Sequence, residues 1–544
     1  LFRTRDHGQT WERISPDLTT NNPEKQKQEQ SGGVTVDNSS AEMNNTVYAI
    51  SESPKNNDVV WVGTDDGNVQ VTRDGGKSWT NVTKNLPLAP NAWISYVDTG
   101  HFGEGTAFVT VDMHTTGDMK PYAYKTTDFG ATWTPLIADN SGVNGYAHVI
   151  REDLVNPHLL YAGTEHGLWI SLDDGGKWAQ YKGGDMPVGV AVRDIAIHPR
   201  DNDLVLATHG RGIWIVDDIS PLRALTPDVM AKEAEFLQSA PAVQRIFGQG
   251  GWVPGDAQFV GNNPPGDAVI TYYQRKRHIF GDLKIEVLDS AGNVVGTIPS
   301  SKRRGLNRVT WSMRTKPPKV APAASAAFGA AVGPRVLPGT YTVRMTKDKN
   351  VYTTPLSVIT DPRATYKPED RKANYDLANK LKGDITDMAY SVEQMNAIRS
   401  ALDERASKLP ASDATAKKLR AASDSVDTIR KKVVATKEGG MITGEERLRE
   451  NITDVYSGVV FYEGRPSQTQ VDRADAIHRE MADVDADFKA WSTKELPSIN
   501  AALAKKNLPP IKLMTRDEWD KSNASEAGGS PTATENEFRM FERD

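Results

Sequence analysis

The sequence predicts a mainly β protein in which β-propeller blades, forming an incomplete ring within this chain, are followed by a β-sandwich and a C-terminal α-helical bundle. A motif repeated four times in the first third, alternating strands in the middle and helical periodicity in the last third carry this prediction. The expected domains are blades at 1–225, a linker at 226–266, the sandwich at 267–362, helices at 363–512 and an extended tail at 513–544.

The composition limits the classes of function. The 544 residues, 38% of them hydrophobic, suffice for about three or four domains. A net charge of -6 without any long basic run argues against nucleic-acid and anionic-membrane partners. No stretch approaches the roughly 18 to 20 apolar residues that span a bilayer. The absence of cysteine excludes disulfides, thiolate nucleophiles and Cys-ligated zinc. Leu1 is neither a start methionine nor the head of a signal peptide, so we expect the gene product to begin earlier.

The repeated motif is the octapeptide Ser/Thr-x-Asp-x-Gly-x-x-Trp, at residues 4–11, 72–79, 126–133 and 171–178. Its Ser/Thr and Asp side chains can bond the backbone of a turn, its Gly permits a positive φ, and its Trp is expected to pack beneath the turn. The structural positions are Asp6, Gly8, Trp11, Asp74, Gly76, Trp79, Asp128, Gly130, Trp133, Asp173, Gly175 and Trp178.

Each octapeptide follows β-rich sequence, so the repeating unit is one blade of four strands. The units lie at about 33–85, 92–138, 145–183 and 190–220, with a half blade at 1–18. The last unit lacks the octapeptide and is expected to be the closing blade. Because a half blade cannot close a ring, we expect earlier blades upstream or on another chain.

The middle of the chain predicts a two-sheet sandwich. Alternating strands are expected near 268–273, 283–289, 294–298, 305–312 and 338–345, with a hairpin turn at 289–293. The strand at 338–345 resembles the penultimate strand of fibronectin-like sandwiches, which implies an immunoglobulin-like domain. Residues 316–334, rich in Ala and Pro, are expected to form a mobile loop.

The last third predicts a small antiparallel helical bundle. Amphipathic spacing covers about 368–408, 412–436, 443–460 and 468–506, and Pro368, Glu369 and Asp370 stand where a helix start favours proline and acids. The stretch 522–544 has too few apolar residues to fold alone and is expected to extend or dock.

The octapeptide is the Asp-box, and it resembles the repeats of sialidases, two-propeller xyloglucanases and the sortilin-type (VPS10) receptor domain. The whole chain resembles the C-terminal half of large bacterial BNR-repeat proteins of Gram-negative envelopes, named glycosyl hydrolase or exo-α-sialidase. The matching segments are VVWVGTDDG at 59–67, VIRED at 149–153, YAGTEHG at 161–167, ATHGRGIW at 207–214 and LPSINAAL at 496–503. The resemblance implies an extracytoplasmic location: periplasmic, cell-surface or secreted.

Candidate ligand-facing residues are charged side chains of the expected inner strands and of one turn: Arg151, Glu152, Asp153, Arg193, Asp194, His209 and Arg211. This choice assumes that they point into a central channel. The alternative is that Arg and Asp side chains in the channel pair with one another.

No catalytic residue is assigned. Sialidase-like chemistry would need an arginine cluster, an Asp acid and a Tyr nucleophile paired with Glu, and xyloglucanase-like chemistry would need two facing carboxylates. No metal or cofactor is expected, because no two of His114, His166, His198 and His209 have the helical i, i+4 spacing of a zinc site.

Two function classes follow from these patterns. The first is an extracytoplasmic binding or scaffolding protein that engages protein or glycan through a propeller face and its accessory domains. Its partner would be another protein chain or the missing N-terminal propeller half. The alternative is a glycoside hydrolase whose site lies largely in that missing half. The fold alone does not choose between them.

Overall fold

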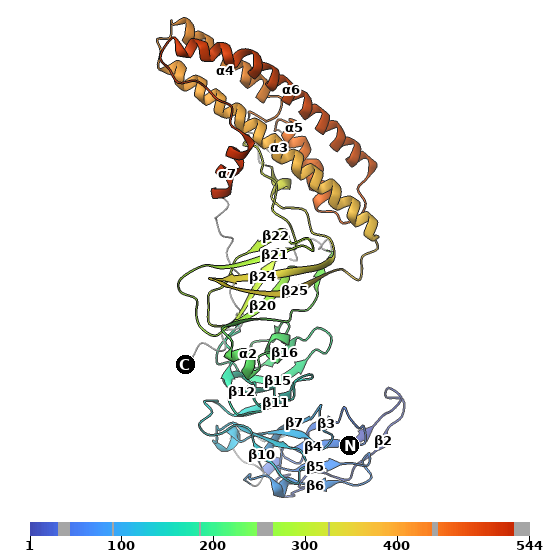
Figure 1. Ribbon diagram of the computed structural model, residues 1–544. Coiled ribbons are helices and arrows are strands. Elements are labelled where there is room, and N and C mark those ends of the chain that lie inside the picture. The colour runs from blue at the N-terminus through green and yellow to red at the C-terminus, as the bar shows by residue number, and fades with distance from the viewer. Residues whose placement is uncertain are drawn as a thin grey trace.

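The computed structural model describes residues 1–30, 44–89, 92–183, 186–246, 265–324, 327–437 and 444–526. The chain forms three successive parts, with an arc of blade-like sheets at one end, a two-sheet sandwich in the middle and long helices at the other end (Figure 1). The arc is of the propeller type. Of the predicted segments, 33–43 of the first blade, 247–264 of the linker and 527–544 of the tail lie outside the described residues.

Four antiparallel sheets follow one another along the arc, and we number them blades one to four. Blades one to three have four strands each and blade four has three. Before them, β1 and β2 form a separate pair. The strands are β1 (Phe2–Arg3), β2 (Glu12–Arg13), β3 (Val47–Glu52), β4 (Val60–Thr64), β5 (Val69–Thr72), β6 (Thr80–Asn81), β7 (Trp93–Thr99), β8 (Ala107–Asp112), β9 (Tyr122–Thr126), β10 (Thr134–Pro135), β11 (Ala147–Glu152), β12 (Leu160–Thr164), β13 (Gly167–Ser171), β14 (Ala179–Gln180), β15 (Val192–Ile197), β16 (Leu204–Thr208) and β17 (Ile213–Val216).

The octapeptides connect the third and fourth strands of their blades, and their side chains bond the turn as predicted. In blade one, Gly76 N–H donates to Thr72 Oγ1 at 2.9 Å, and Ser78 N–H donates to Asp74 Oδ1 at 2.9 Å. Hydrogen bonds from the hydroxyl of Ser78 and, to a lesser extent, from its backbone N–H hold the pKa of Asp74 at about 2. The turns are therefore tied by ionised carboxylates.

Two of the octapeptide tryptophans also form a hydrogen bond with the preceding sheet. Trp79 Nε1 donates to the carbonyl of Ile14 at 2.9 Å, and Trp178 Nε1 donates to the carbonyl of Leu136 at 3.0 Å. The indole thus joins one blade to the outer strand of the one before it. Trp11, by contrast, is 61% exposed.

A glycine in the second strand lets neighbouring blades approach. A Cβ on Gly163 would lie 2.5 Å from Val149 Cγ1 and 2.6 Å from the carbonyl oxygen of Val192 in the next blade. A Cβ on Gly63 would likewise lie 2.5 Å from Ile94 Cγ2 of the next blade. No larger side chain fits there without moving backbone or β-branched neighbours.

The sandwich consists of two sheets around one core, in the strand orders β18-β20-β23 and β19-β25-β24-β21-β22. All neighbours are antiparallel except β19, which runs parallel to β25. The strands are β18 (Ala234–Leu237), β19 (Ala242–Gln244), β20 (Ala268–Gln274), β21 (Leu283–Leu288), β22 (Val294–Ile298), β23 (Gly305–Trp311), β24 (Gly339–Lys347) and β25 (Asn350–Thr360).

The segment predicted as a linker at 226–266 is structured over its first part. It contains α2 (Pro227–Ala231), just after α1 (Ser220–Arg223), and then the edge strands β18 and β19. These strands are only four and three residues long, too short for a periodic signal, and their partners β20 and β25 come much later in the chain. The sandwich therefore begins earlier than predicted.

The loop at 316–334 packs against the helices in its described residues, contrary to the predicted mobility. Ala321 and Ala330 are each 2% exposed and belong to the helical core. The Arg449 side chain donates to the carbonyl of Ala321 at 2.7 Å, and Tyr456 Oη donates to that of Val332 at 2.8 Å. Alanine is small enough for this close packing and is also common in mobile segments. The composition of 316–334 therefore does not distinguish a packed loop from a mobile one.

The helices form an elongated bundle (Figure 1) with its own core. They are α3 (Pro368–Ser407), α4 (Ala414–Arg430), α5 (Leu448–Val460), α6 (Gln468–Ala504) and α7 (Arg516–Glu526). Within the described part of the chain, no helix is long and apolar enough to cross a membrane. The tail predicted as extended contains α7, whose Trp519 is 2% exposed and donates through Nε1 to Glu393 at 2.6 Å.

Replacing the indole that joins two sheets tests the inter-blade bond. Trp79→Phe is expected to lower the free energy of unfolding by about 1–2 kcal/mol, because the bond to Ile14 is lost. Trp11→Phe is the matched control, since the same octapeptide position is exposed there, and it should change stability by less than about 0.5 kcal/mol. Urea unfolding measures both, and equal losses would contradict the inter-blade role.

Acid should weaken the octapeptide turns. Hydrogen bonds within the turns hold the pKa of Asp6, Asp74 and Asp128 at about 2. A depressed folded-state pKa stabilises the fold above the unfolded value of about 4, and this contribution is lost as the pH falls towards 2. The melting temperature should fall across that window, and less steeply in a variant with all three residues changed to Asn. If the melting temperatures of the wild-type protein and the variant fell equally with pH, the acid sensitivity would not come from these three carboxylates.

Candidate functional site

The first strands of the four blades, β3, β7, β11 and β15, lie next to one another along the arc. Side chains near the beginnings of these strands gather with the end of β8 into one group, which we call the inner-strand cluster. Its members are Tyr48, Trp93, Asp112, His114, Tyr146, His148 and Arg193. Four blades thus contribute to one site.

Asp112 is the buried centre of the cluster, with 1% of its surface exposed. His114 Nδ1 lies 2.5 Å from its Oδ1 and His148 Nδ1 lies 3.2 Å from its Oδ2. Burial alone would raise the pKa of Asp112, but the hydrogen bonds from His148 and His114 outweigh it, and the pKa lies below its ordinary value. Asp112 is therefore an ionised anchor for two imidazoles.

Arg193 continues the network towards the surface. Its Nη2 donates to Tyr146 Oη at 2.9 Å, and its Nη1 lies 3.1 Å from His148 Nδ1 and 3.9 Å from Asp112 Oδ2. His148 Nδ1 thus faces an arginine donor and a carboxylate acceptor. A neutral imidazole can serve only one of them, because Nδ1 either carries the proton for Asp112 or accepts from Arg193.

Aromatic rings form the accessible side of the cluster. Trp93 meets Tyr48 edge to face with centroids 4.8 Å apart, and His114 stacks on Tyr146 at 4.5 Å. Tyr48 is 49% exposed, and the His114 and Arg193 side chains are about a third exposed. Rigid aromatics beside an arginine are typical of the residues that dominate binding energy in protein interfaces.

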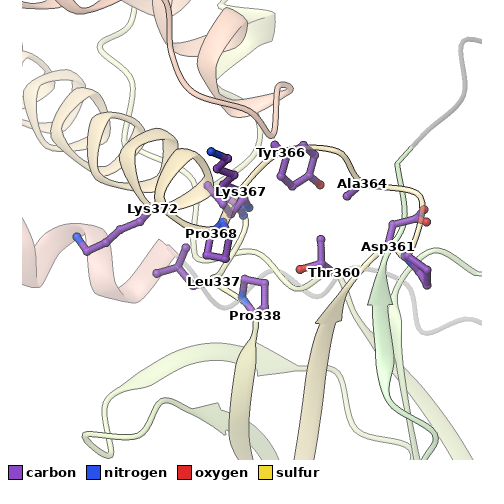
Figure 2. Close-up of a pocket in the computed structure, with 11 residues that line it drawn as sticks. Leu337, Pro338, Thr360, Asp361, Ala364, Tyr366, Lys367, Pro368 and Lys372 are labelled. Atoms are coloured by element: carbon purple, nitrogen blue, oxygen red, sulfur yellow. The ribbon is translucent and has the colours of Figure 1, made fainter.

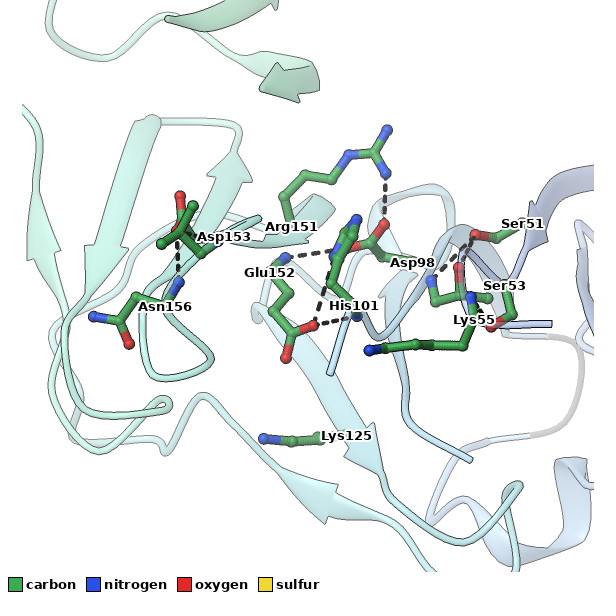
Figure 3. A network of polar contacts seen from close by, with 12 residues as sticks. Ser51, Ser53, Lys55, Asp98, His101, Lys125, Arg151, Glu152, Asp153 and Asn156 are labelled. Atoms are coloured by element: carbon green, nitrogen blue, oxygen red, sulfur yellow. Dashed lines mark hydrogen bonds and ion pairs between the residues drawn. The ribbon is translucent and has the colours of Figure 1, made fainter. Parts of the chain in front are cut away.

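A second network lies near the ends of the inner strands (Figure 3). Arg151 Nη1 lies 2.5 Å from Asp98 Oδ1, Glu152 N–H donates to Asp98 Oδ2 at 3.0 Å, and His101 N–H donates to Glu152 Oε2 at 2.6 Å. Burial raises the pKa of Asp98 despite the opposing charge of Arg151. These groups pair with one another, which was the alternative reading of the charged inner strands.

The predicted ligand-facing residues do not form one site. Arg193 belongs to the inner-strand cluster, and Arg151 pairs with Asp98. Glu152 and Asp153, 2% and 0% exposed, are buried among protein partners, and Asp153 forms a bidentate pair with Arg223. This burial removes both from the ligand-facing set.

Three further predicted residues are exposed, and one of them, Asp194, lies beside the second network. Burial lowers the pKa of Arg151, but the charges of Asp98, Tyr96 and Asp194 together raise it above its ordinary value. Asp194 accepts from its neighbour Ile195 N–H at 2.8 Å.

His209 and Arg211 occupy the exposed turn before β17, where the Arg211 carbonyl accepts from Trp214 Nε1 at 3.0 Å. The backbone hydrogen bonds of His209 and Arg211 go to Ala191 and Trp214 and not to the cluster that Arg193 joins.

Sequence reasoning missed most of the cluster. Asp112, Tyr146 and His148 stand at the end or start of strands, and nothing in their local pattern distinguishes them from turn residues. Aligning the blades would have placed Tyr48, His148 and Arg193 at the same position, the bulged residue near the start of their first strands. That alignment is the signal that could have found them.

Three buried carboxylates of the two networks are already bonded and do not face solvent as an acid and base pair would. Asp98, Asp112 and Glu152 are each at most 2% exposed and bonded to protein donors. Throughout the described ranges, no three His, Asp or Glu side chains are arranged to hold a metal ion.

A separate cavity of about 550 Å³ lies where the sandwich meets α3 (Figure 2). Proline and leucine line much of it, and its one carboxylate, Asp361, is bonded to Arg363 at 2.6 Å. Lys372 at the rim pairs with Asp376 at 2.6 Å. Because Asp361, Arg371 and Lys372 in its lining are already paired, we assign no ligand to this cavity between domains.

No protein-family model and no curated protein matches the chain. Among solved structures, it is similar to a GH74 enzyme of Niastella koreensis at 18% identity and a TM-score of 0.23, over 31% of this chain and 22% of that one. It is also similar to YCF48 of Cyanidioschyzon merolae at 17% identity and a TM-score of 0.24, over 32% and 53%. A peptide-bound YCF48 shows 13% identity and a TM-score of 0.24, over 57% and 81%. The chain thus spans about a fifth of the GH74 enzyme and about half of the first YCF48.

Removing the charge of Asp112 tests the anchor. Asp112→Asn should lower the free energy of unfolding by about 1–3 kcal/mol, because buried imidazole donors lose a charged acceptor. Asp139→Asn is the control, since that side chain is 93% exposed, and it should stay within about 0.5 kcal/mol. Urea unfolding at neutral pH measures both, and an unchanged Asp112→Asn midpoint would show that the cluster does not depend on this carboxylate.

Proposed function

We propose that the chain is a binding or scaffolding protein that acts outside the cytoplasm and engages protein or glycan partners through the inner-strand cluster. The observation that carries the proposal is an accessible surface of Tyr48, His114 and Arg193 above a buried carboxylate that is already hydrogen-bonded to two histidines. Such a surface can stack on a partner and donate hydrogen bonds, and its carboxylate is buried beneath the rings. A protein partner fits the aromatic and arginine content best.

We also propose that this partner, another protein chain or a further propeller segment, covers blade four. The strand register places Ile213 and Ile215 of β17 where blade three has Leu168 and Ile170. Leu168 and Ile170 are 1% and 2% exposed because blade four covers them, whereas Ile213 and Ile215 are 72% and 58% exposed. A further sheet with an apolar face would bury them in the same way.

The finer classification of the parts belongs to the same proposal. The octapeptide turns support Asp-box (BNR) blades of the sortilin-like kind. For the sandwich, the strand order, the parallel β19–β25 pair and a hydrogen bond from Tyr341 Oη to the carbonyl of Leu337 at 2.7 Å support an immunoglobulin-like domain. The extracytoplasmic location rests on the family resemblance, and cell fractionation tests it.

A glycoside hydrolase with its site largely outside this chain is the second candidate. It would need two carboxylates that face a substrate, one of them protonated. The buried and paired state of Asp98, Asp112 and Glu152 does not favour that chemistry within this chain.

Affinity measurements test the binding proposal. A tagged chain is cross-linked in the source cells, its partners are identified by mass spectrometry, and each purified partner, or a glycan array, is titrated with variants. Tyr48→Ala and Arg193→Ala should each weaken binding at least about ten-fold, as hot-spot residues do. Arg211→Ala, an exposed arginine outside the cluster, is the matched control.

Two results would contradict the proposal. Equal affinity of the wild-type protein and both cluster variants would remove the cluster as the binding surface. Release of reducing sugar from a polysaccharide panel, abolished by Asp112→Asn but not by Asp139→Asn, would favour the hydrolase instead.

A further inference from the structure

Three loops meet at the end of the sandwich away from the helices. They are 275–282 between β20 and β21, 299–304 between β22 and β23, and the turn 348–349 between β24 and β25. Backbone hydrogen bonds join them: His278 N–H donates to Lys302 O at 2.9 Å, and Asp348 N–H donates to Asp282 O at 3.1 Å. We call this group the basic loop end.

The first of these loops presents two apolar side chains to solvent. Ile279 is 67% exposed and Phe280 is 86% exposed, the latter more than any other large hydrophobic side chain among the described residues. His278 just before them is 7% exposed and anchors the loop inward. Gly281 just after them has a φ of +87°, and a Cβ there would meet the Asp348 carboxylate at 2.0 Å. The loop is therefore held in a conformation that points Ile279 and Phe280 outward.

Basic side chains surround this apolar tip. Two triplets of basic residues, at 275–277 and 302–304, lie on adjacent loops although they are 25 or more positions apart in the sequence. The turn at 348–349 adds one lysine. The set is Arg275, Lys276, Arg277, Lys302, Arg303, Arg304 and Lys349. The acids beside it are Asp282, Asp348 and Glu233, the last of which pairs with Lys347. Neither triplet is a long basic run by itself, so the sequence argued against an anionic surface as partner. The tertiary structure reverses that argument.

We propose that the basic loop end docks on the surface of a lipid bilayer that carries anionic phospholipid headgroups, with Phe280 and Ile279 entering the interface. Cations around the tip meet the negative surface potential, and the two apolar side chains leave water. This inference stands apart from the binding function proposed for the inner-strand cluster.

The apolar tip favours a bilayer over a nucleic acid. A phosphate backbone would neutralise the basic side chains, and a base could stack on Phe280, but Ile279 has no flat face for a base. A bilayer interface accepts both an aromatic and an aliphatic side chain beside lysines and arginines, whose charged ends stay in the headgroup layer.

The expected affinity is modest and sensitive to salt. Each lysine or arginine close to an anionic membrane strengthens binding about five-fold at physiological ionic strength, and the effect decays within a Debye length. Several cations with two inserted side chains therefore give reversible attachment.

Vesicle co-sedimentation of the full chain tests the proposal. The chain is mixed with vesicles of phosphatidylcholine alone or of phosphatidylcholine with phosphatidylglycerol. We expect binding only to the anionic vesicles, weakened by salt. Ile279→Ser with Phe280→Ser should lower the partition coefficient at least about ten-fold, and Lys276→Ala and Arg277→Ala should each lower it about five-fold. Val155→Ser, which removes another exposed apolar side chain, 62% exposed in the arc, should leave it unchanged.

A site-specific probe makes insertion visible. Because the chain has no cysteine, Phe280→Cys can be labelled alone with a fluorophore that brightens and shifts to shorter wavelength in an apolar setting. The label should respond to anionic vesicles at position 280, and the same label on Val155→Cys should not.

The proposal would be overturned if the chain did not bind anionic vesicles, or if it bound both vesicle types equally. It would also be overturned if the probe at position 280 stayed in water while the protein bound. A fourth contrary result would be binding to duplex DNA as tight as to anionic vesicles and unchanged by the substitution of Phe280. Circular dichroism of each variant shows that a loss does not come from unfolding. The cluster variants Tyr48→Ala and Arg193→Ala should keep wild-type vesicle binding.

Discussion

The apolar faces of the blades are covered by neighbouring blades, and the first part of the structure depends on this constraint. Leu168 and Ile170 of blade three share one core with Val192 and Ile195 of blade four. The small residue at Gly163 lets the sheets come that close. At the interface of blades two and three, Trp178 of the octapeptide adds a directional bond to the carbonyl of Leu136. Packing and a hydrogen bond thus both hold neighbouring blades together.

That constraint also explains the polar character of the inner strands. First strands of successive blades come together along the arc, and the polar side chains near their two ends meet one another. Asp98 with Arg151, and Asp112 with two histidines and Arg193, satisfy one another, as buried charges must. The part of the inner-strand cluster left accessible is aromatic and cationic, which suits recognition better than proton transfer.

The domains are connected by contacts rather than by a free linker. Arg308 of the sandwich donates to the carbonyl of Asp218 at the end of blade four, at 2.9 Å, and Tyr273 and Leu306 share a core with Leu222 of α1. At the other end, residues 316–334 carry alanines into the helical core. The sandwich is thus held at both ends, and its loops beside the arc face solvent with a strong excess of basic residues.

The sequence by itself determined what depends on local pattern. The octapeptide turns, the blade units and the helices at 368–407 and 468–504 follow from turn chemistry and periodicity, which act within a few residues. The tertiary structure alone decided what depends on distant partners. The edge strands β18 and β19, the packed loop at 316–334, the pairing of Asp153 with Arg223, and the meeting of Asp112 with His148 and Arg193 join positions about 30 or more residues apart. The two basic triplets at 275–277 and 302–304 became one surface for the same reason: charge acts through distance in space, and the fold sets that distance.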